Sequence, residues 1–312
     1  MRARAPASSA NLGPGFDVLA LALALYVEVE MVPAERLSLC SEGEGTNLAC
    51  DEHHLAARVA SAVCGHDRFA IRVRSEIPVG RGLGSSAALT VAAAAAAGAA
   101  DPLKVAVGFE GHPENAAASF RGGLVSAALL DTGPVVRRFP LDPALAFVVL
   151  VADRELLTVE ARGALDAKVP HGDAVFNLSR MGLLLAGLAD HTVLIGAAGE
   201  DRLHQSQRLH LFPEASELLA RLMKAGALVS CWSGAGPSLL GICDGPSAAA
   251  HVRDAGEAAL EALGVPGRAL VLSPDLEGLI VERGASRDRE RAWAAGIHGR
   301  ARRGGAGAPA TG

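Results

Sequence analysis

The sequence predicts an α+β chain of two domains, and three observations carry this prediction. The chain has 312 residues, a length typical of two domains of roughly 150 residues each. Along most of it, single segments with the two-residue period of a strand alternate with single segments of helical period. Half of the residues are apolar and 20% are charged, which excludes a wholly disordered chain. Aromatic residues are scarce, so the core must consist mainly of Ala, Val and Leu.

The first third of the chain shows this alternation clearly. Residues 26–32 and 69–74 alternate apolar with charged side chains, which is the period of a strand with one solvated face. Residues 52–64 instead repeat apolar side chains every four positions, as an amphipathic helix does. A glycine-containing loop at 77–84 and an Ala-rich helix from Ser85 follow.

The alternation continues through the rest of the chain. We predict strands at 124–130, 147–151, 227–232 and 239–243, and helices at 158–165 and 173–189. Because prolines interrupt both ladders and helices, the Pro- and Asp-containing stretch 138–143 is the best candidate for a domain boundary. We therefore expect one domain at 1–143 and a second at 144–284.

The charge of the chain argues against a nucleic-acid partner. Residues 285–312 hold six Arg and two acidic residues among many Gly and Ala, which predicts a disordered, solvated basic tail. Such a tail could touch nucleic acid. The whole chain, however, has 29 basic and 34 acidic residues and a formal charge of −5, the wrong sign for a surface that binds a polyanion.

Cysteine usage and hydropathy indicate a cytoplasmic protein. The five cysteines are odd in number and never closer than ten residues, so neither a disulfide framework nor a CxxC zinc site is expected. The longest apolar stretches, at 18–27 and 87–100, are well short of the ~20 residues of a membrane helix. No signal sequence opens the chain. We expect no membrane partner.

Two glycine-containing loops suggest a ligand site, although each has a simpler interpretation. The segment PASSANLGPGFD at 6–17 is polar and rich in Pro and Gly; it could be a turn whose Asn and Asp bond the local backbone. The segment SGAGPS at 233–238 lies between two predicted strands and could be a hairpin turn. Two such loops in one chain are also compatible with two walls of one ligand site.

A third segment, PVGRGLGSSAA at 78–88, indicates a phosphate site more directly. A strand ends, three glycines follow, and Ser85 and Ser86 begin a long helix. Glycines let backbone N–H groups approach a phosphate, and a helix start adds unpaired N–H groups and the positive end of the dipole. The loop is neither a Walker A nor a GxGxxG motif. The simpler interpretation is a glycine-rich turn with a Ser N-cap.

The three segments, in this order, resemble the signature motifs of the GHMP small-molecule kinases, and within that superfamily the chain is most similar to the homoserine kinases. Further blocks of that family are matched by EGHPENAAASFRGG, ADRELLTVEAR and EDRLHQSQR, so the similarity runs from Pro6 to Arg283. The resemblance implies an N-terminal nucleotide domain of the ribosomal-protein-S5-domain-2-like type and a C-terminal ferredoxin-like domain. It also implies transfer of the ATP γ-phosphoryl group to the side-chain hydroxyl of L-homoserine in threonine biosynthesis, and by analogy a homodimer.

The resemblance also implies roles for individual residues. The ATP loop would be Pro78, Val79, Gly80, Arg81, Gly82, Leu83, Gly84, Ser85, Ser86, Ala87 and Ala88. The L-homoserine pocket would hold Asn11, Asp17, His112, Asn115, Thr158, Arg162 and Arg208, with Asn115 and Arg162 as catalytic residues. Homoserine is a zwitterion, so Arg162 or Arg208 suits its carboxylate and Asp17 its ammonium. His112 could instead cap the helix that follows it.

Three departures from the family pattern leave questions open. Only five residues precede Pro6 where relatives carry a strand, so we expect either a truncated start or a very short first strand. Glu114 replaces the Asp of the HPDN block. The span 88–109 is short, and Lys104 stands where some relatives place the acidic Mg²⁺ ligand. The resemblance implies Ser86 as one Mg²⁺ ligand, and Glu110 is the nearest acidic candidate for the other. Two alternatives to an active homoserine kinase stay open: a GHMP kinase for another small alcohol, and a catalytically silent ligand-binding protein on the same scaffold.

Overall fold

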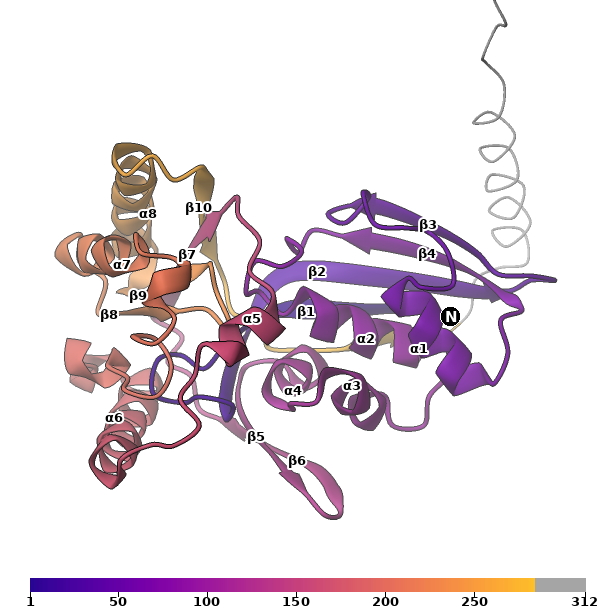
Figure 1. Cartoon of the computed structure of the whole chain (residues 1–312), viewed down its shortest axis with the longest axis horizontal. Helices are drawn as coiled ribbons and strands as arrows, with labels where there is room; N and C mark the ends of the chain where they lie inside the picture. The colour runs from indigo at the N-terminus through magenta and orange to yellow at the C-terminus, as the bar shows by residue number, and fades with distance from the viewer. Residues whose placement is uncertain (284–312) are drawn as a thin grey trace, which may run out of the picture.

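The computed structural model describes residues 1–283 and contains two β-sheets, each flanked by helices (Figure 1). The predicted disordered tail at 285–312 lies outside the described residues. Figure 1 shows the first sheet with helices α1 to α4 on one side of the molecule and the second sheet with α6 to α8 on the other. Within the described residues, no helix is both long and apolar enough to cross a bilayer.

The first sheet has seven strands. Its order is β11-β1-β2-β4-β3, and β5 pairs with both β2 and β6. Every pairing is antiparallel except that of β3 with β4. The strands are β1 (Arg2–Ala10), β2 (Leu19–Pro33), β3 (Ser38–Gly43), β4 (Phe69–Ser75), β5 (Leu124–Leu130), β6 (Gly133–Phe139) and β11 (Ile280–Glu282).

Four helices cover this sheet: α1 (Leu55–Cys64), α2 (Ser85–Ala96), α3 (Pro102–Glu110) and α4 (Glu114–Arg121). The predicted strands and helices of the first domain are present, although α1 begins three residues later than predicted because His54 caps it. Nine of the twelve residues of α2 are buried, most of them Ala. Small side chains let α2 pack close to the sheet in a core that has few aromatic residues.

The first strand corrects two predictions. β1 is nine residues long and continues through Pro6 to Ala10, so it is not very short, and only the second part of the 6–17 segment is a loop. Burial alternates only over residues 2–5, and every residue from Ala5 to Ala10 is buried, so β1 lacks the two-residue period of a strand with one solvated face. The pairing register shifts between Pro6 and Ala7, as expected where a proline cannot donate to the ladder.

The second sheet confirms the predicted ferredoxin-like half. Its order is β10-β7-β9-β8, all antiparallel, which is strand order 4-1-3-2 of a β-α-β-β-α-β chain. The elements are β7 (Leu145–Ala152), α5 (Thr158–Gly163), α6 (His171–Ala189), α7 (Ala215–Lys224), β8 (Val229–Trp232), β9 (Leu239–Asp244), α8 (Gly245–Ala262) and β10 (Gly267–Leu272), with short 3₁₀ turns at His191–Val193, Gly196–Gly199 and Leu209–Leu211.

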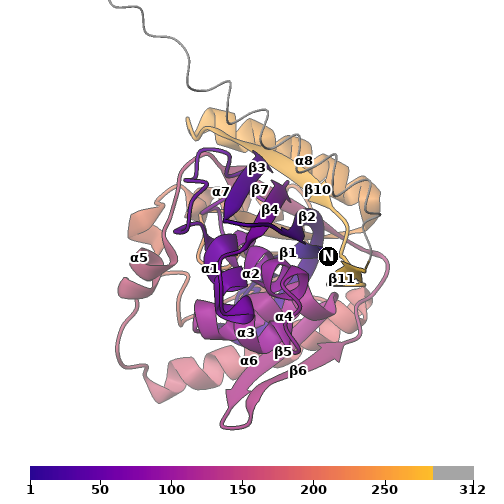
Figure 2. The same cartoon turned by 90° about the vertical axis from the view of Figure 1, so that its right-hand side faces the viewer.

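The two halves are joined by more than the linker near 138–143. After β10 the chain returns to the first sheet, where β11 pairs with β1 beside the N-terminus (Figure 2). In the linker, Asp142 accepts hydrogen bonds from the backbone and ring of His191, which in turn lies 3.4 Å from Asp244 at the end of β9. The division at residue 143 remains a prediction. One strand does not follow it: β11 belongs to the first sheet although it falls within 144–284.

Candidate active site

A polar cavity lies where the three predicted loops meet. Its walls come from the end of β1 and the following loop, the loop before α2, the hairpin loop between β8 and β9, and the segment around α5. Backbone bonds tie the loops together: Ser8 N–H donates to the Leu83 carbonyl, and Gly234 N–H donates to the Ala10 carbonyl. The Ser233 hydroxyl donates to the Gly82 carbonyl at 2.7 Å. SGAGPS is therefore a hairpin loop and a wall of the site at once.

The loop before α2 is built for close backbone approach. Gly80, Gly82 and Gly84 all have positive φ, between 65° and 73°, a region that L side chains rarely adopt. A Cβ on Gly82 would collide with the Ser233 carbonyl, and one on Gly84 with the Ser8 hydroxyl. Gly84, not a serine, is the N-cap of α2, and no side chain caps it. The first turn of α2 thus keeps N–H groups that an anion could satisfy.

The loop after β1 is strained and firmly held. Asn11 and Leu12 have φ of 71° and 50° and are followed by Gly13 at 80°, and each non-glycine residue in this region costs on the order of 1 kcal/mol. The Asn11 amide donates to the Gly234 carbonyl and accepts from the Asp17 N–H. From α6, the buried Asn177 donates to the Pro14 carbonyl. These contacts offset the strain and fix Asp17 at the cavity.

Arg162 and Asp17 form a bidentate ion pair across the cavity. Their Nη1–Oδ2 and Nη2–Oδ1 distances are 2.9 and 2.7 Å, and about a third of each side chain is exposed. The hydrogen bonds to Asp17, and the charge of that carboxylate, raise the pKa of Arg162. Partly exposed pairs of this kind contribute little net stability, so a ligand with one cationic and one anionic group could displace the Arg162–Asp17 contact.

Arg208 is a second guanidinium in the same wall, and it is buried. Its Nε donates to the Ala161 carbonyl, and its Nη1 lies 3.2 Å from the Gly234 carbonyl and 3.0 Å from Nδ1 of His204. Burial, followed by the nearby Arg162 charge, lowers the pKa of Arg208 to about 10. It stays a cation at neutral pH and lacks a carboxylate hydrogen-bond partner among the described residues, as an anion-binding group should.

The Asn115 amide at the start of α4 is oriented by two neighbours. The Ser8 hydroxyl donates to its Oδ1 at 2.8 Å, and its Nδ2 donates to Oε1 of Glu114 at 3.1 Å. One Nδ2 hydrogen is left for the cavity. His112 lies 2.9 Å from the same Glu114 carboxylate, which raises its pKa, and it does not cap α4, whose N-cap is Pro113.

Ser86 and Glu110 meet at the edge of the cavity, where the Ser86 hydroxyl donates to the Glu110 carboxylate. Burial raises the pKa of Glu110. A partly exposed carboxylate beside a hydroxyl is an oxygen donor set of the kind that Mg²⁺ takes together with phosphate oxygens.

Most predicted site residues line this cavity, and a few do not. Lining residues are Asn11, Asp17, Gly80, Arg81, Gly82, Gly84, Ser85, Ser86, Ala87, Glu110, Asn115, Thr158, Arg162 and Arg208. Pro78, Val79, Leu83, Ala88 and His112 are not among the lining residues. Phe16, Glu114 and Leu156 also line it and were not predicted, nor was Ser8, which supports it from behind. The functional roles of the predicted site residues remain predictions.

A second cavity, mainly apolar and of about 300 Å³, adjoins the first. Ser85 and Ser86 line both, while Val27, Leu48, Leu89 and Val79 give the second its apolar walls. The start of α2 thus separates a polar space from an apolar one.

Comparison with known proteins identifies the family. The model of the GHMP kinases N terminal domain matches residues 49–123, and that of the GHMP kinases C terminal domain matches residues 182–262. A homoserine kinase of Moorella thermoacetica is 40% identical over 257 residues, covering 78% of this chain and 87% of that protein. One of Leifsonia xyli subsp. xyli is 38% identical over 303 residues, covering 90% and 91%.

A solved structure agrees with these matches. The homoserine kinase of Cytophaga hutchinsonii superposes with a TM-score of 0.79 at 26% identity, covering 90% of this chain and 97% of that one. With relatives of this identity aligned over most of their own length, the chain belongs to the GHMP kinase family, within its homoserine kinases.

Proposed function

We propose that this protein phosphorylates the side-chain hydroxyl of L-homoserine with ATP, giving O-phospho-L-homoserine and ADP. The observation that carries the proposal is one cavity in which a glycine loop at a helix start faces Asp17, Arg162 and Arg208. The first is a phosphate-binding device, and the other three match a zwitterionic amino acid. Family membership supplies ATP as co-substrate.

The nucleotide would lie across the start of α2. We assign the adenine to the apolar cavity and the triphosphate to the loop 80–87, because Ser85 and Ser86 border both spaces. Backbone N–H groups of the uncapped first turn and the α2 dipole would stabilise the phosphate charge. The γ-phosphate would then point into the polar cavity.

The amino acid would replace the contact between Arg162 and Asp17. Its carboxylate would take Arg162, with Arg208 as the second guanidinium, and its ammonium would take Asp17. Arg162 and Asp17 neutralise each other in their ion pair. With the amino acid bound, each would instead pair with the ligand group of opposite charge. A sugar or mevalonate lacks the ammonium and would leave Asp17 without a cationic partner.

Asn115 would hold the reacting hydroxyl. Its Oδ1 is occupied by Ser8 and one Nδ2 hydrogen by Glu114, so the remaining N–H is oriented toward the cavity. The hydroxyl oxygen bonds to the γ-phosphorus while the bond from that phosphorus to the bridging oxygen breaks, and the hydroxyl proton leaves with solvent or phosphate. Phosphoryl transfer depends mainly on such positioning and on charge stabilisation.

Ser86 and Glu110 fit an Mg²⁺ ion, and we propose them as its protein ligands. The fit rests on their direct contact and on the burial that raises the pKa of Glu110. When bound, the ion would neutralise charge on the β- and γ-phosphates. Cytoplasmic location remains a prediction from cysteine usage and hydropathy, and homodimeric assembly remains a prediction from the family resemblance.

The test is ADP release by the purified protein with Mg·ATP and L-homoserine, L-serine, L-threonine, mevalonate or galactose. We expect turnover with L-homoserine and a phosphate ester on its side-chain oxygen in the ³¹P NMR spectrum. Turnover with mevalonate or galactose and none with homoserine would replace the amino-acid assignment by another alcohol. ATP binding without turnover of any substrate would indicate a silent binding protein.

A further inference from the structure

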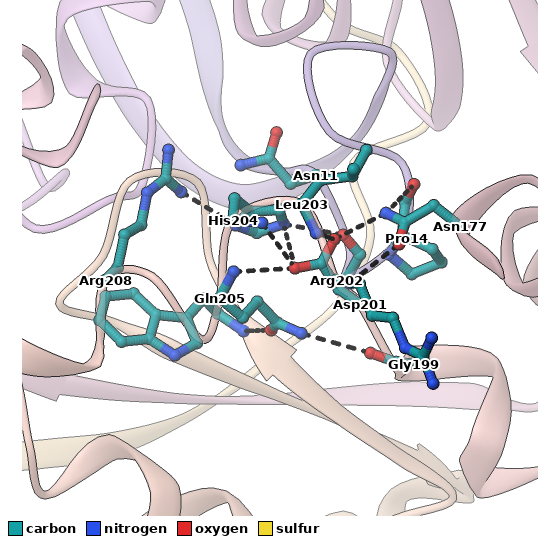
Figure 3. Close-up of polar contacts among 12 residues, drawn as sticks. Asn11, Pro14, Asn177, Gly199, Asp201, Arg202, Leu203, His204, Gln205 and Arg208 are labelled. Carbon is teal, nitrogen blue, oxygen red and sulfur yellow. Dashed lines mark hydrogen bonds and ion pairs between the residues drawn. The ribbon is translucent and has the colours of Figure 1, made fainter. Parts of the chain in front are cut away.

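His204 lies between two parts of the amino-acid pocket without lining it. It follows the 3₁₀ turn Gly196–Gly199 and is fully buried. Its Nε2 lies 2.8 Å from the Gly13 carbonyl oxygen, and its Nδ1 lies 3.0 Å from Nη1 of Arg208. Figure 3 shows the imidazole between the Arg208 guanidinium and the residues that surround Asp201.

These two partners define where the imidazole proton is. A carbonyl oxygen only accepts, so Nε2 must carry the hydrogen, and a guanidinium only donates, so Nδ1 must offer its lone pair. The ring is therefore neutral and in a single tautomer. Burial agrees with this, since it lowers the pKa of His204 to about 4.

The hydrogen bond from Arg208 to His204 is one of three that hold the Arg208 guanidinium in place. Its Nε is bonded to Ala161, and its Nη1 to Gly234 and His204, whereas Nη2 has no hydrogen bond to any described residue. In Figure 3 one terminal nitrogen of Arg208 points at His204 and the other away from it. The outer edge of the guanidinium is thus left for a ligand.

The opposite face of His204 contacts the loop after β1. The Phe16 ring stacks on the imidazole with centroids 5.1 Å apart, and Phe16 also lies within 6 Å of both guanidinium carbons, of Arg162 and Arg208. Gly13 and Phe16 belong to the loop that carries Asn11 and Asp17. His204 therefore joins the loop of the ammonium partner to the carboxylate partner.

His204 is itself held by a buried turn. The Asp201 carboxylate accepts the N–H groups of Leu203, His204 and Gln205 and the amide of Asn177. Asn177 also bonds the Pro14 carbonyl of the same loop. The charged groups nearest the ring are Asp201, Arg208 and Asp17.

From this geometry we propose that His204 is a positioning residue for amino-acid recognition. Acting as a neutral acceptor, it fixes the Arg208 guanidinium at the place where the substrate carboxylate binds. The inference rests on the proposed function, because it takes L-homoserine as the ligand of Arg208. It assigns His204 no contact with substrate.

Three substitutions separate the two contacts of the ring. His204→Asn places an amide oxygen near the position of Nδ1 and can still accept from Arg208. His204→Gln places an amide nitrogen near Nε2 and keeps only the Gly13 contact. His204→Leu removes both. His210→Asn is the matched control, because His210 is in the same segment but its Nδ1 contacts only the Gln207 carbonyl.

The measurement is steady-state kinetics with L-homoserine and with ATP as the varied substrate. We expect His204→Gln and His204→Leu to raise the KM for homoserine about 10- to 100-fold, since a misplacement near 1 Å is costly. The KM for ATP and kcat should stay within about threefold. His204→Asn should stay within about threefold of wild type in every constant, and His210→Asn should be unchanged.

A substrate without a carboxylate sharpens the test. 3-Aminopropan-1-ol is homoserine without its carboxylate, so its kcat/KM should be the same in wild type and in His204→Gln. Equal losses for Asn and Gln variants, or parallel rises in the KM values for homoserine and ATP, would show that His204 only packs the fold. If the wild type does not phosphorylate homoserine at all, the proposed function fails and this inference with it.

Discussion

The two sides of the active-site cavity are built by different means. The phosphate side is one continuous segment, 80–87, and presents backbone groups of glycines and a helix start. The amino-acid side draws Asp17, Asn115, Arg162 and Arg208 from four separate segments and presents side chains. Backbone groups cannot be changed by substitution, but side chains can. The difference suggests that GHMP kinases share the nucleotide, which backbone groups bind. The alcohol substrate is selected by the side chains of the amino-acid side.

The largest effect should come from a substitution on the phosphate side. In Gly82→Ala the new Cβ would collide with the Ser233 carbonyl at a positive φ. We expect kcat/KM for ATP to fall at least about 100-fold and stability to fall by about 2–4 kcal/mol, measured by kinetics and urea unfolding.

Gly65→Ala is the matched control. Gly65 also has a positive φ, but it lies at the end of α1, where a Cβ would have nothing within 4 Å. It should cost about 1 kcal/mol of stability and leave the KM for ATP unchanged. An equal kinetic loss in both variants would mean that the close approach of Gly82 does not matter.

Acidification should lower the stability of the protein through His204, which supports the amino-acid side. Its pKa is about 4 in the folded chain, against about 6.5 when unfolded, so only the unfolded chain takes up this proton between those values. The free energy of unfolding should fall from pH 6.5 to pH 4, by at most about 3 kcal/mol from this group. In His204→Asn this contribution is absent, so the stability advantage of wild type over the variant, measured by urea unfolding, should shrink as pH falls. A constant difference across the range would contradict the assigned neutral ring.

Removing one side chain of the amino-acid side should leave the phosphate side intact. Arg162→Ala should raise the KM for L-homoserine about 100-fold, the loss expected when one partner of a charged contact is truncated, with the KM for ATP nearly unchanged. Arg162→Lys should lie between wild type and Ala, since an ammonium cannot make the bidentate contact. A similar rise in both KM values would place Arg162 elsewhere in the mechanism.

The smallest effect should come from a residue behind the cavity wall. Ser8→Ala removes the hydrogen bond that orients the Asn115 amide, a neutral bond worth about 1 kcal/mol. We expect kcat to fall about fivefold with both KM values little changed. Ser9→Ala is the control, because the neighbouring Ser9 hydroxyl is buried without a hydrogen-bond partner among the described residues; it should leave kcat as it is.

The same contrast explains what could be predicted from the sequence. The loop at 78–84 and the helix from Ser85 are contiguous, so local chemistry was sufficient to predict them, and the ferredoxin-like half followed from the family resemblance. Ser8, Phe16 and His204 were missed because they act through residues distant in sequence. Ser8 meets Asn115 across 107 positions and His204 meets Gly13 across 191. No period or spacing reports such contacts.

Local patterns also misled where side chains are small. Strand β1 is buried on both faces from Ala5 to Ala10, so it has no two-residue period, and its small side chains and Pro6 made it resemble a loop. The simpler interpretation of the 78–88 segment, a Ser N-cap, is wrong: the N-cap of α2 is Gly84, because a left-handed residue is needed where the chain turns past Ser8.

The return of β11 to β1 has a consequence for synthesis on the ribosome. Arg2 and Glu282, which pair across these strands, are 280 positions apart. At roughly 5–20 residues per second, the outer edge of β1 waits about 15–55 s for its last neighbour. Throughout that interval the nascent chain exposes a strand edge, and the arginines and the proline of β1 are residue types that discourage pairing with other chains. These residues thereby protect the edge of β1 from pairing with other chains until β11 is synthesised.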